Sequence, residues 1–371
     1  MPAQAAEQAA IRAELRAVAR DLLAAAGAGA GPDWQQLAAA DWLGLEVAAD
    51  FGGAGATFAE VAVIAEELGR AAALSPYLSA VVLPAGVLTA LQPGDQRDSL
   101  LRQIASGSVI AAAVLGHGDQ PGAILAGADQ PLPFRLEPAA GDTLLHGAAS
   151  FVPGVAEAGR LLVLAAGPGG TPVIVSADPA LPGLSVTRQP VLDATRSLGA
   201  VRADAVPVSP ERIWPFAGDP VAALHRLDGR AAAAVACDSL GVSEAMLAGT
   251  VAYARVREQF GRPIGSFQAV KHACADMLVQ IRVARELVTE AVERVADPDC
   301  PPGEASVAAS MAKAYTGDAA VEIAGKAMQL HGGIGYTWES GLHVYLKRAV
   351  LNRELFGSPA AHRRRLAVRY G

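Results

Sequence analysis

The feature that most constrains this chain is a change of pattern along its length, from helical to strand-like and back to helical. In residues 10–26 the larger apolar residues are Ile11, Leu15, Val18 and Leu22, spaced by four, three and four. This spacing places them on one stripe of an amphipathic helix, with the charged residues on the other faces. A turn-rich stretch follows before the next helical run, so we expect the chain to begin with a helical domain.

The middle of the chain has a different character, because Pro and Gly recur and the apolar runs become short. Residues 161–164 and 172–175 are such runs, and residues 167–170 between them read Gly-Pro-Gly-Gly. Short apolar runs bounded by turn residues predict β-strands. Since no helical pattern lies between them, an antiparallel sandwich or barrel is expected rather than repeated βαβ units.

Long helical patterns return from about residue 220 and are interrupted once, at residues 297–303, by three prolines and a glycine. Proline lacks the backbone N–H that a helix interior needs, so this stretch ends a helix. The sequence therefore predicts an α+β protein of three parts. These are an N-terminal helical domain (1–105), a middle antiparallel β domain (106–215) and a C-terminal four-helix-type bundle (216–371).

Composition and charge exclude some classes of function. The chain has 371 residues, of which 52% are hydrophobic and only 5% aromatic. This alanine-rich balance favours close-packed helices, and the length is enough to bury a cofactor. The net charge of −7 argues against nucleic acid as a partner, because such binding depends on Lys and Arg neutralising phosphates.

The cysteines and apolar runs bear on compartment and cofactors. Cys237, Cys274 and Cys300 are odd in number and widely spaced, a usage typical of a reducing compartment. A basic segment followed by an apolar run is missing at the N-terminus, and no apolar stretch reaches about 18 uninterrupted residues. We therefore expect a cytoplasmic protein without a membrane span. The histidines show no metal-ligand spacing, so no metal site is expected.

Two segments of the C-terminal third carry the most information. Residues 253–264 read Tyr-Ala-Arg-Val-Arg-Glu-Gln-Phe-Gly-Arg-Pro-Ile, and residues 329–336 read Gln-Leu-His-Gly-Gly-Ile-Gly-Tyr. An arginine at a helix end can make charge-assisted contacts to a pyrophosphate, and paired glycines let a ligand approach the backbone closely. The alternative is a helix cap with a solvated arginine and a glycine stop. The first segment resembles the acyl-CoA dehydrogenase signature, and the second resembles the glycine turn of that family.

The resemblance extends along the chain and implies both fold and cofactor. Residues 42–45, 51–55 and 66–69 resemble the family's N-terminal helical domain, and residues 193–196 resemble its exit from the β domain, with Arg196 as a structural ion-pair partner. The family binds FAD across a subunit interface. By resemblance, the residues that contact the pyrophosphate and adenosine half are Arg257, Gln259, Phe260, Gln268, Gln329, Gly332 and Gly333.

The chain departs from the family at the catalytic base. The family removes a proton from Cα of the thioester with a glutamate, while a hydride leaves Cβ for the flavin. The two family positions for that glutamate correspond here to Phe356 and Ala231, neither of which can accept a proton. Asp238 and Glu354 are the nearest substitutes, and both are poor ones. No catalytic residue is therefore assigned.

The flavin-ring side of the β domain departs as well. Residues 114–120 read Val-Leu-Gly-His-Gly-Asp-Gln where the family usually has a Thr-Glu and glycine-rich loop. Residues 151–153 read Phe-Val-Pro where the family has Trp-Ile-Thr. Because proline supplies neither a hydroxyl nor an N–H donor, the ring pocket of this chain is expected to be degenerate.

These departures resemble the non-catalytic subunit of actinobacterial heterotetrameric acyl-CoA dehydrogenases, several of which act in steroid side-chain degradation. The resemblance implies a flavoprotein oxidoreductase of fatty acid or steroid degradation, inactive as an isolated chain, that completes the FAD site of a catalytic partner. An acyl-CoA substrate and an acceptor such as electron-transfer flavoprotein are then expected. The alternatives are a flavin-free structural or acyl-CoA-binding relative, and a self-sufficient homotetramer with a relocated base. The basic residues 362–365 are expected to form a solvated helix end.

Overall fold

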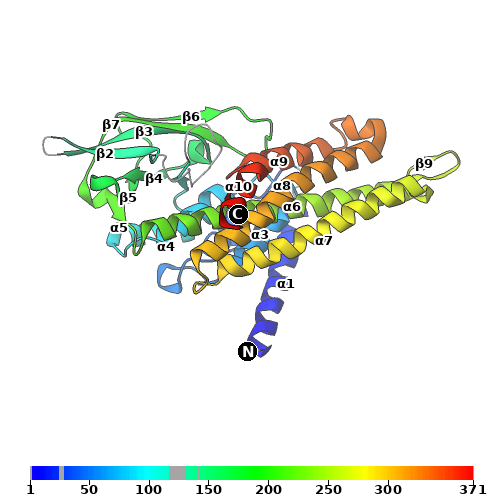
Figure 1. The fold of residues 1–371 in the computed structure, drawn as a ribbon, viewed down its shortest axis with the longest axis horizontal. Helices are drawn as coiled ribbons and strands as arrows, with labels where there is room; N and C mark the ends of the chain where they lie inside the picture. Colours follow the sequence, from blue (N-terminus) through cyan, green and yellow to red (C-terminus); the bar gives the residue numbers. More distant parts are fainter. Residues whose placement is uncertain (1, 25–28, 117–130, 140–141, 371) are drawn as a thin grey trace.

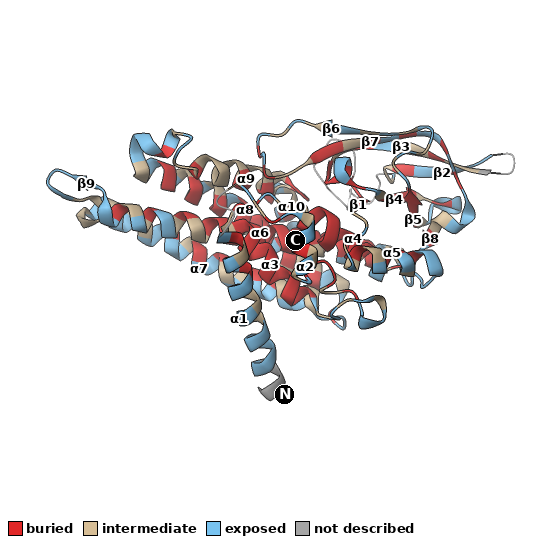
Figure 2. Ribbon diagram, turned by 180° about the vertical axis from the view of Figure 1, so that it is seen from behind, coloured by how far each residue is buried: buried red, intermediate tan, exposed pale blue. Residues whose placement is uncertain are grey.

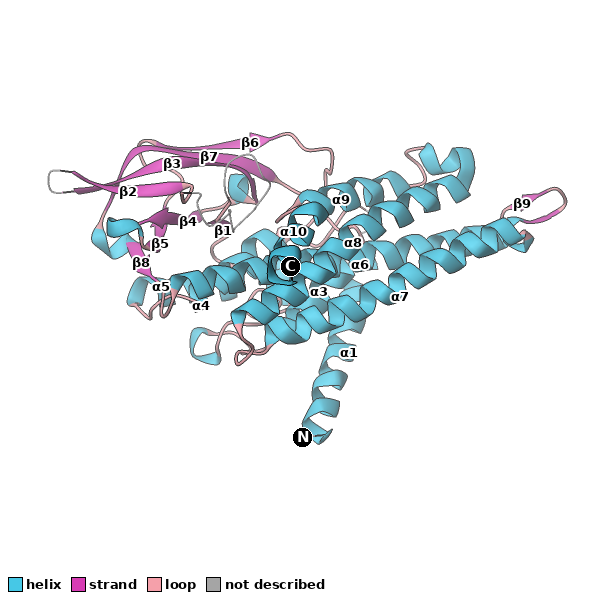
Figure 3. Cartoon of the chain, viewed as in Figure 1, coloured by secondary structure: helices cyan, strands magenta, loops and turns pink. Residues whose placement is uncertain are grey.

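The computed structural model describes residues 2–24, 29–116, 131–139 and 142–370. A β domain lies at one end of the molecule, and long helices run from its side to the opposite end (Figure 1). The first helix leaves the body at an angle, so that none of the described helices or strands lies beside its N-terminal part (Figure 3). The expected order of helical, β and helical parts is confirmed.

The N-terminal helical part supplies a core helix that packs on the C-terminal bundle. Its helices are α1 (Pro2–Ala24), α2 (Trp34–Ala39), α3 (Phe58–Arg70), α4 (Leu83–Thr89) and α5 (Asp95–Ala105), and a π-helical turn, Leu78–Val82, leads into α4. A capping box starts α3, because the Thr57 side chain accepts from backbone N–H groups while the Glu60 carboxylate accepts from the N–H of Thr57. The amphipathic helix expected from residue 10 onward is α1.

The β domain is mainly antiparallel, with two parallel pairings. Its strands are β1 (Ala111–Val114), β2 (Phe134–Ala139), β3 (Asp142–Pro153), β4 (Arg160–Ala166), β5 (Pro172–Ala177), β6 (Leu184–Gln189), β7 (Leu198–Val208) and β8 (Ile213–Pro215). The sheet order is β6-β7-β3-β2-β4-β5-β8. Both β1 and β2 run parallel to β4, whereas the other neighbours are antiparallel. The expected strands at 161–164 and 172–175 are β4 and β5.

The C-terminal part is a bundle of long helices. Its helices are α6 (Pro220–Val256), α7 (Gln268–Ala296), α8 (Pro302–His331), α9 (Leu342–Glu354) and α10 (Pro359–Tyr370). The proline-rich stretch ends α7, and Pro302 is the first residue of α8, where its missing N–H costs no helical hydrogen bond. The domain boundaries expected from the sequence remain a prediction, and they fall in the turns after α5 and after β8.

Close packing of α3 on α6 brings the two helical parts together. A Cβ at Gly69 would collide with the backbone of Asp238, and a Cβ at Gly241 would collide with the backbone of Glu66. Glycine on both faces of this crossing therefore allows the backbones to approach each other. The buried residues concentrate where these helices meet (Figure 2).

The helix α6 is long and apolar enough to span a membrane by those two criteria alone. Of its most apolar window, 78% is buried inside the protein. Its apolar character is thus explained by its place at the centre of the bundle, where α3, α7 and α8 cover it.

Candidate functional site

The signature segment forms the free end of the bundle. Helix α6 ends at Val256, Arg257 caps it, and the chain reverses through the hairpin β9 (Glu258–Gln259) and β10 (Arg262–Pro263). The two turn residues, Phe260 and Gly261, have φ of 54° and 75°. Two positive φ values in a two-residue loop match the right-handed twist of a hairpin. The hairpin lies at the extreme opposite the β domain (Figure 1).

The glycine turn reaches the same end of the bundle from α8. The rings of Tyr253 and His331 stack with centroids 4.4 Å apart and an interplanar angle of 22°. The Tyr253 hydroxyl also donates to the carbonyl of His331 at 3.4 Å. This contact joins the end of α6 to the end of α8. The structure therefore places the two segments, 65 or more residues apart in the sequence, at one end of the bundle.

All seven residues expected to bind FAD have exposed side chains or backbone at this end. The ring of Phe260 is 92% exposed. The Arg257 guanidinium has no hydrogen bond or ion pair with any residue that the structure describes, and Gln259 donates only to the carbonyl of Glu258. Their polar atoms are thus free for a ligand.

The glycines of the second segment have separate roles. Gly332 has φ of 64°, whereas Gly333 has no such restriction, and a Cβ on either would meet open space within this chain. A Cβ on Gly335 would instead lie 2.4 Å from the carbonyl oxygen of Met328. Gly335 is required for packing, and Gly332 for backbone conformation. Only Gly333 is left without a structural reason inside the chain.

The residues at this end fit one half of a dinucleotide. An unpaired guanidinium suits a pyrophosphate, an exposed aromatic ring suits a base, and open glycine backbone permits close approach. We call this end, formed by residues 257–268 and 329–333, the bundle tip, and its hairpin projects away from the rest of the chain (Figure 3). A second surface is needed to enclose a cofactor there.

The first family position of the catalytic glutamate is occupied here by Phe356, which is packed in the interior. Phe356 is 2% exposed and has φ of 59°, a conformation that is uncommon for a bulky residue. Its carbonyl accepts from His362 Nε2 at 3.0 Å, and the next carbonyl, that of Gly357, accepts from Lys313 Nζ at 2.8 Å. Since Nε2 carries the proton, Nδ1 is the atom that accepts from the Ser310 hydroxyl.

This arrangement corrects the expectation for the basic run at residues 362–365. His362 is fully buried, and Arg365 pairs with the buried Asp228 at 2.7 Å. Burial, together with the nearby Lys313, lowers the pKa of His362 to about 3. Half of the run thus holds α10 to the bundle, through His362 and Arg365, whereas Arg363 and Arg364 are exposed as expected. No local sequence signal marks this burial, because it depends on partners from other helices.

Asp238, the first substitute base, is held in a buried cluster. Arg348 donates to both of its carboxylate oxygens, at 2.9 and 2.5 Å, Arg196 donates at 2.8 Å and Asn352 at 2.7 Å. Burial alone would raise the pKa of Asp238, but the two guanidinium groups outweigh it and lower the pKa to about 2. Such a carboxylate cannot serve as a proton acceptor. The expected structural ion pair of Arg196 is confirmed.

Neither the second substitute, Glu354, nor the second family position, Ala231, supplies a base. Glu354 is 45% exposed on its side chain and accepts from the neighbouring Arg353 at 2.9 Å, as expected of a surface carboxylate. Ala231 is fully buried in α6. The cavity beside Asp238 has a volume of about 10 Å³ and is lined by residues that include Tyr77, Arg196 and Ala234. It has room for about one water molecule and not for an acyl chain.

The residues of the β domain that correspond to the family's flavin-ring contacts also have partners within this chain. The Phe151 N–H donates to the Gln189 side chain at 2.6 Å, and Pro153 lies opposite Leu198 in the pairing of β3 with β7. The neighbouring Gly154, with φ of 67°, lies directly against Ser79. Residues 117–120, where the family's Glu is missing, lie outside the described residues.

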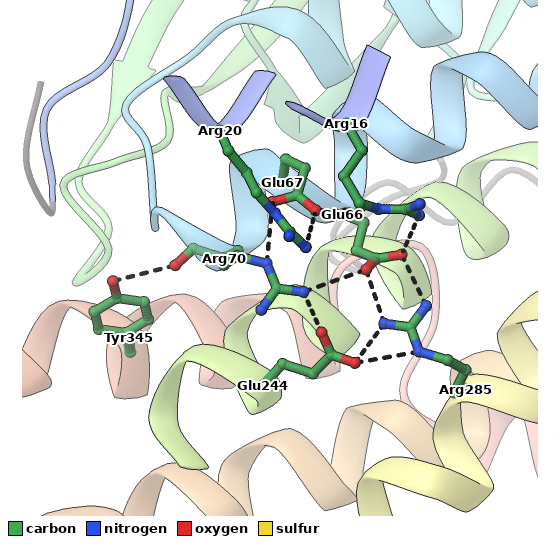
Figure 4. A network of polar contacts seen from close by, with 8 residues as sticks. All are labelled: Arg16, Arg20, Glu66, Glu67, Arg70, Glu244, Arg285 and Tyr345. Atoms are coloured by element: carbon green, nitrogen blue, oxygen red, sulfur yellow. Dashed lines mark hydrogen bonds and ion pairs between the residues drawn. The ribbon is translucent and has the colours of Figure 1, made fainter. Parts of the chain in front are cut away.

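Glu66 and Glu67 of the N-terminal segment belong to an ion-pair network between helices (Figure 4). Glu66 accepts from Arg285 of α7 at 2.8 Å, while Glu67 accepts from Arg20 of α1 and Arg70 of α3, each at 3.0 Å. Glu244 of α6 joins the same network. These charges hold α1, α3, α6 and α7 together. Their role is structural.

The three-part fold, with a β domain between two helical parts, is that of flavin-dependent dehydrogenases, and comparison with known proteins agrees. The family model "Acyl-CoA dehydrogenase, N-terminal domain" matches residues 5–108, and "Acyl-CoA dehydrogenase, C-terminal domain" matches residues 223–371. The chain belongs to the acyl-CoA dehydrogenase family. Members of this family bind FAD.

Individual relatives extend this finding. The chain is 31% identical over 324 residues to acyl-CoA dehydrogenase IpdE2 of Mycobacterium tuberculosis, covering 87% of this chain and 81% of that protein. A solved structure of a variant of the Tcur3481-Tcur3483 steroid ACAD has a TM-score of 0.82 at 28% identity, over 97% of both chains. The ChsE4-ChsE5 complex of Mycobacterium tuberculosis has a TM-score of 0.83 at 24% identity, over 97% and 96%, and shares the fold.

Proposed function

We propose that this chain is the non-catalytic subunit of a heterotetrameric acyl-CoA dehydrogenase, and that its bundle tip completes the FAD site of a catalytic partner. The observation that carries the proposal is that polar groups have partners within the chain at one place and lack them at another. At the tip Arg257 has no partner within the described chain, whereas at the base positions every group is packed or paired. A surface kept free of internal partners is suited to a ligand shared with another subunit.

The geometry argues that this chain does not build one complete FAD site. Gly154, next to the ring-side residues, lies against Ser79 and donates its N–H to the carbonyl of Ser197. The neighbouring Arg196 pairs with Asp238, near the middle of α6. Arg257 follows Asp238 by 19 residues (257 − 238), so about 1.5 Å of rise per residue separates them by about 28 Å of helix. The tip therefore serves a cofactor whose ring is held by another chain.

In such a complex, each part has a separate task. FAD, when bound, takes the hydride that leaves Cβ of the acyl thioester. Arg257 and Gln259 would hold the pyrophosphate, Phe260 and Gln268 would lie along the adenosine, and Gly333 would permit close approach of the backbone. The partner would supply the glutamate and the ring contacts.

The substrate and acceptor are proposed by relationship. The Tcur3481-Tcur3483 relative is named a steroid ACAD, so we propose a steroid-type acyl-CoA ester as the substrate class, electron-transfer flavoprotein as the acceptor and the cytoplasm as the compartment. The cavity of about 10 Å³ beside Asp238 argues against an acyl chain bound at that position.

Co-expression with a catalytic family member tests the proposal. The purified complex should contain two FAD per four chains, measured by mass and flavin absorbance, and the isolated chain should show no acyl-CoA turnover. One FAD per chain, or a stable active homotetramer, would show that the departures at Phe356 and Pro153 are harmless. A stable complex without flavin would favour a structural relative of the fold instead.

A further inference from the structure

A cavity of about 240 Å³ lies where α5 meets the sheet, far from the bundle tip. Its sheet side is formed by Arg160 at the start of β4, Ser176 on β5, Arg212 before β8 and Trp214 on β8. Its helix side includes Ser99 and Gln103 of α5. The cavity thus joins the N-terminal helical part to the β domain.

Two guanidinium groups face this cavity without a carboxylate partner. Arg160 Nη1 is buried and has no hydrogen-bond partner, and within residues 29–116, 131–139 and 142–370 neither Arg160 nor Arg212 forms an ion pair. Burial lowers the pKa of Arg160, and the nearby Arg212 lowers it further, with only partial relief from Asp178. By contrast, the buried Arg348 donates to both oxygens of Asp238.

The remaining polar groups of the cavity add donors. Ser176 is 3% exposed, and its hydroxyl has no hydrogen bond recorded with the described residues. Asp95 and Gln96 lie on the α5 side, so some negative charge is present there. On the sheet side, the hydrogen-bond donors of Arg160, Arg212 and Ser176 still outnumber their acceptors. A buried guanidinium N–H without a partner is costly, and so is the proximity of two like charges.

We propose that this cavity binds a small oxyanion, a phosphate or carboxylate group, between Arg160, Arg212 and the Ser176 hydroxyl. Guanidinium forks match both kinds of oxyanion in two-point hydrogen bonding. Binding would relieve the repulsion between the arginines, and would also link the sheet to α5 through Ser99 or Gln103. This site is separate from the proposed FAD tip and does not depend on the proposed function.

Thermal unfolding of the full-length chain tests the site with defined probes. Phosphate and acetate are each titrated against chloride at equal ionic strength, and the arm with the larger saturable rise in Tm identifies the oxyanion. Arg160→Gln and Arg212→Gln should each weaken the response at least tenfold. Arg202→Gln is the matched control, because Arg202 is exposed on β7 of the same sheet, and it should respond as the parent does.

The anion-free proteins give a second, independent measurement. If Arg160 and Arg212 repel each other, Arg212→Gln should raise Tm in chloride while weakening the phosphate or acetate response as above. A purely structural arginine would instead lower Tm on replacement. The proposal is overturned if neither oxyanion exceeds chloride, if the variants respond as the parent does, or if Arg212→Gln lowers Tm in chloride.

Discussion

The tip and the centre of the bundle differ in whether their polar residues are exposed and unpaired or buried and paired. At the tip, Arg257 and Gln259 are exposed and take no partner from another helix. At the centre, Asp238 and Arg348 are almost wholly buried and hold each other in a two-point ion pair. Asp238 lies within α6, and Arg257 caps the end of the same helix.

This difference shows which polar groups of the chain can still bind a ligand. A polar group that is already saturated inside a chain has nothing to offer a ligand, whereas an unsaturated exposed group does. The centre therefore holds the fold together, and the tip remains available to a partner or cofactor. The following changes would break or sharpen this contrast.

The largest effect is expected from breaking the central cluster. Asp238→Ala leaves Arg348 and Arg196 buried without a counter-charge, which should cost about 3–5 kcal/mol of unfolding free energy. Urea denaturation of the purified chain measures this. Asp318→Ala is the control, because its pair with Arg363 is exposed and should cost at most about 1 kcal/mol. Similar losses in both variants would refute the contrast.

At the tip, the expected loss is in cofactor and not in folding. Arg257→Ala removes a charge-assisted contact worth about 1.5–3 kcal/mol, so FAD affinity of the assembled complex should fall by about 10- to 100-fold. Flavin fluorescence on dilution measures the affinity, and Tm of the isolated chain should stay unchanged. Arg202→Ala removes the same charge from the β domain and should retain FAD fully. Unchanged FAD affinity in Arg257→Ala would contradict the assignment.

The centre should also respond to acid through His362. Its pKa is lowered to about 3 by burial, against about 6.5 in an unfolded chain, so the unfolded chain binds a proton that the folded chain does not. Stability is therefore full above about pH 6.5 and is lost as pH falls toward 3, by about 2 kcal/mol at pH 5.

Comparison of Tm between pH 7 and pH 5 tests this dependence. His362→Gln should flatten the curve, while His272→Gln, at an exposed position on α7, should leave it as steep as in the parent. Lys313, whose pKa burial lowers to about 7, contributes only above pH 7 and does not overlap with this window. Parallel curves for the parent and His362→Gln would remove the role assigned to His362.

The smallest effect is expected from a single methyl group at the tip. Gly333→Ala places its Cβ in open space within the chain, so folding should be unaffected while FAD affinity falls by about 1 kcal/mol. Gly332→Ala should in addition lower Tm, since its φ of 64° with ψ of −144° is accessible almost only to glycine. If Gly333→Ala also lowers Tm and leaves FAD affinity intact, that glycine is structural.

Much of the fold could be predicted from the sequence because its signals are local. The four-three-four spacing in α1, the turn residues around β4 and β5, and the prolines before α8 each act within a few residues. The parallel pairing of β1 and β2 with β4 was not foreseen, since strand pairing is a contact between distant segments. The site residues of the tip remain predictions, although the structure brings their two segments to one end.

The sequence by itself determined the elements, the family and the departure at Phe356 and Ala231, because residue type alone decides whether a side chain can accept a proton. Only the tertiary structure decided how the charges are used. Two arginines from other elements pair with Asp238, so that it cannot accept a proton, whereas Arg257 has no partner among the described residues. Arg160 and Arg212 line the same cavity. The physical reason is that a charge is defined by its solvation and its partners, and these come from segments far apart in the chain.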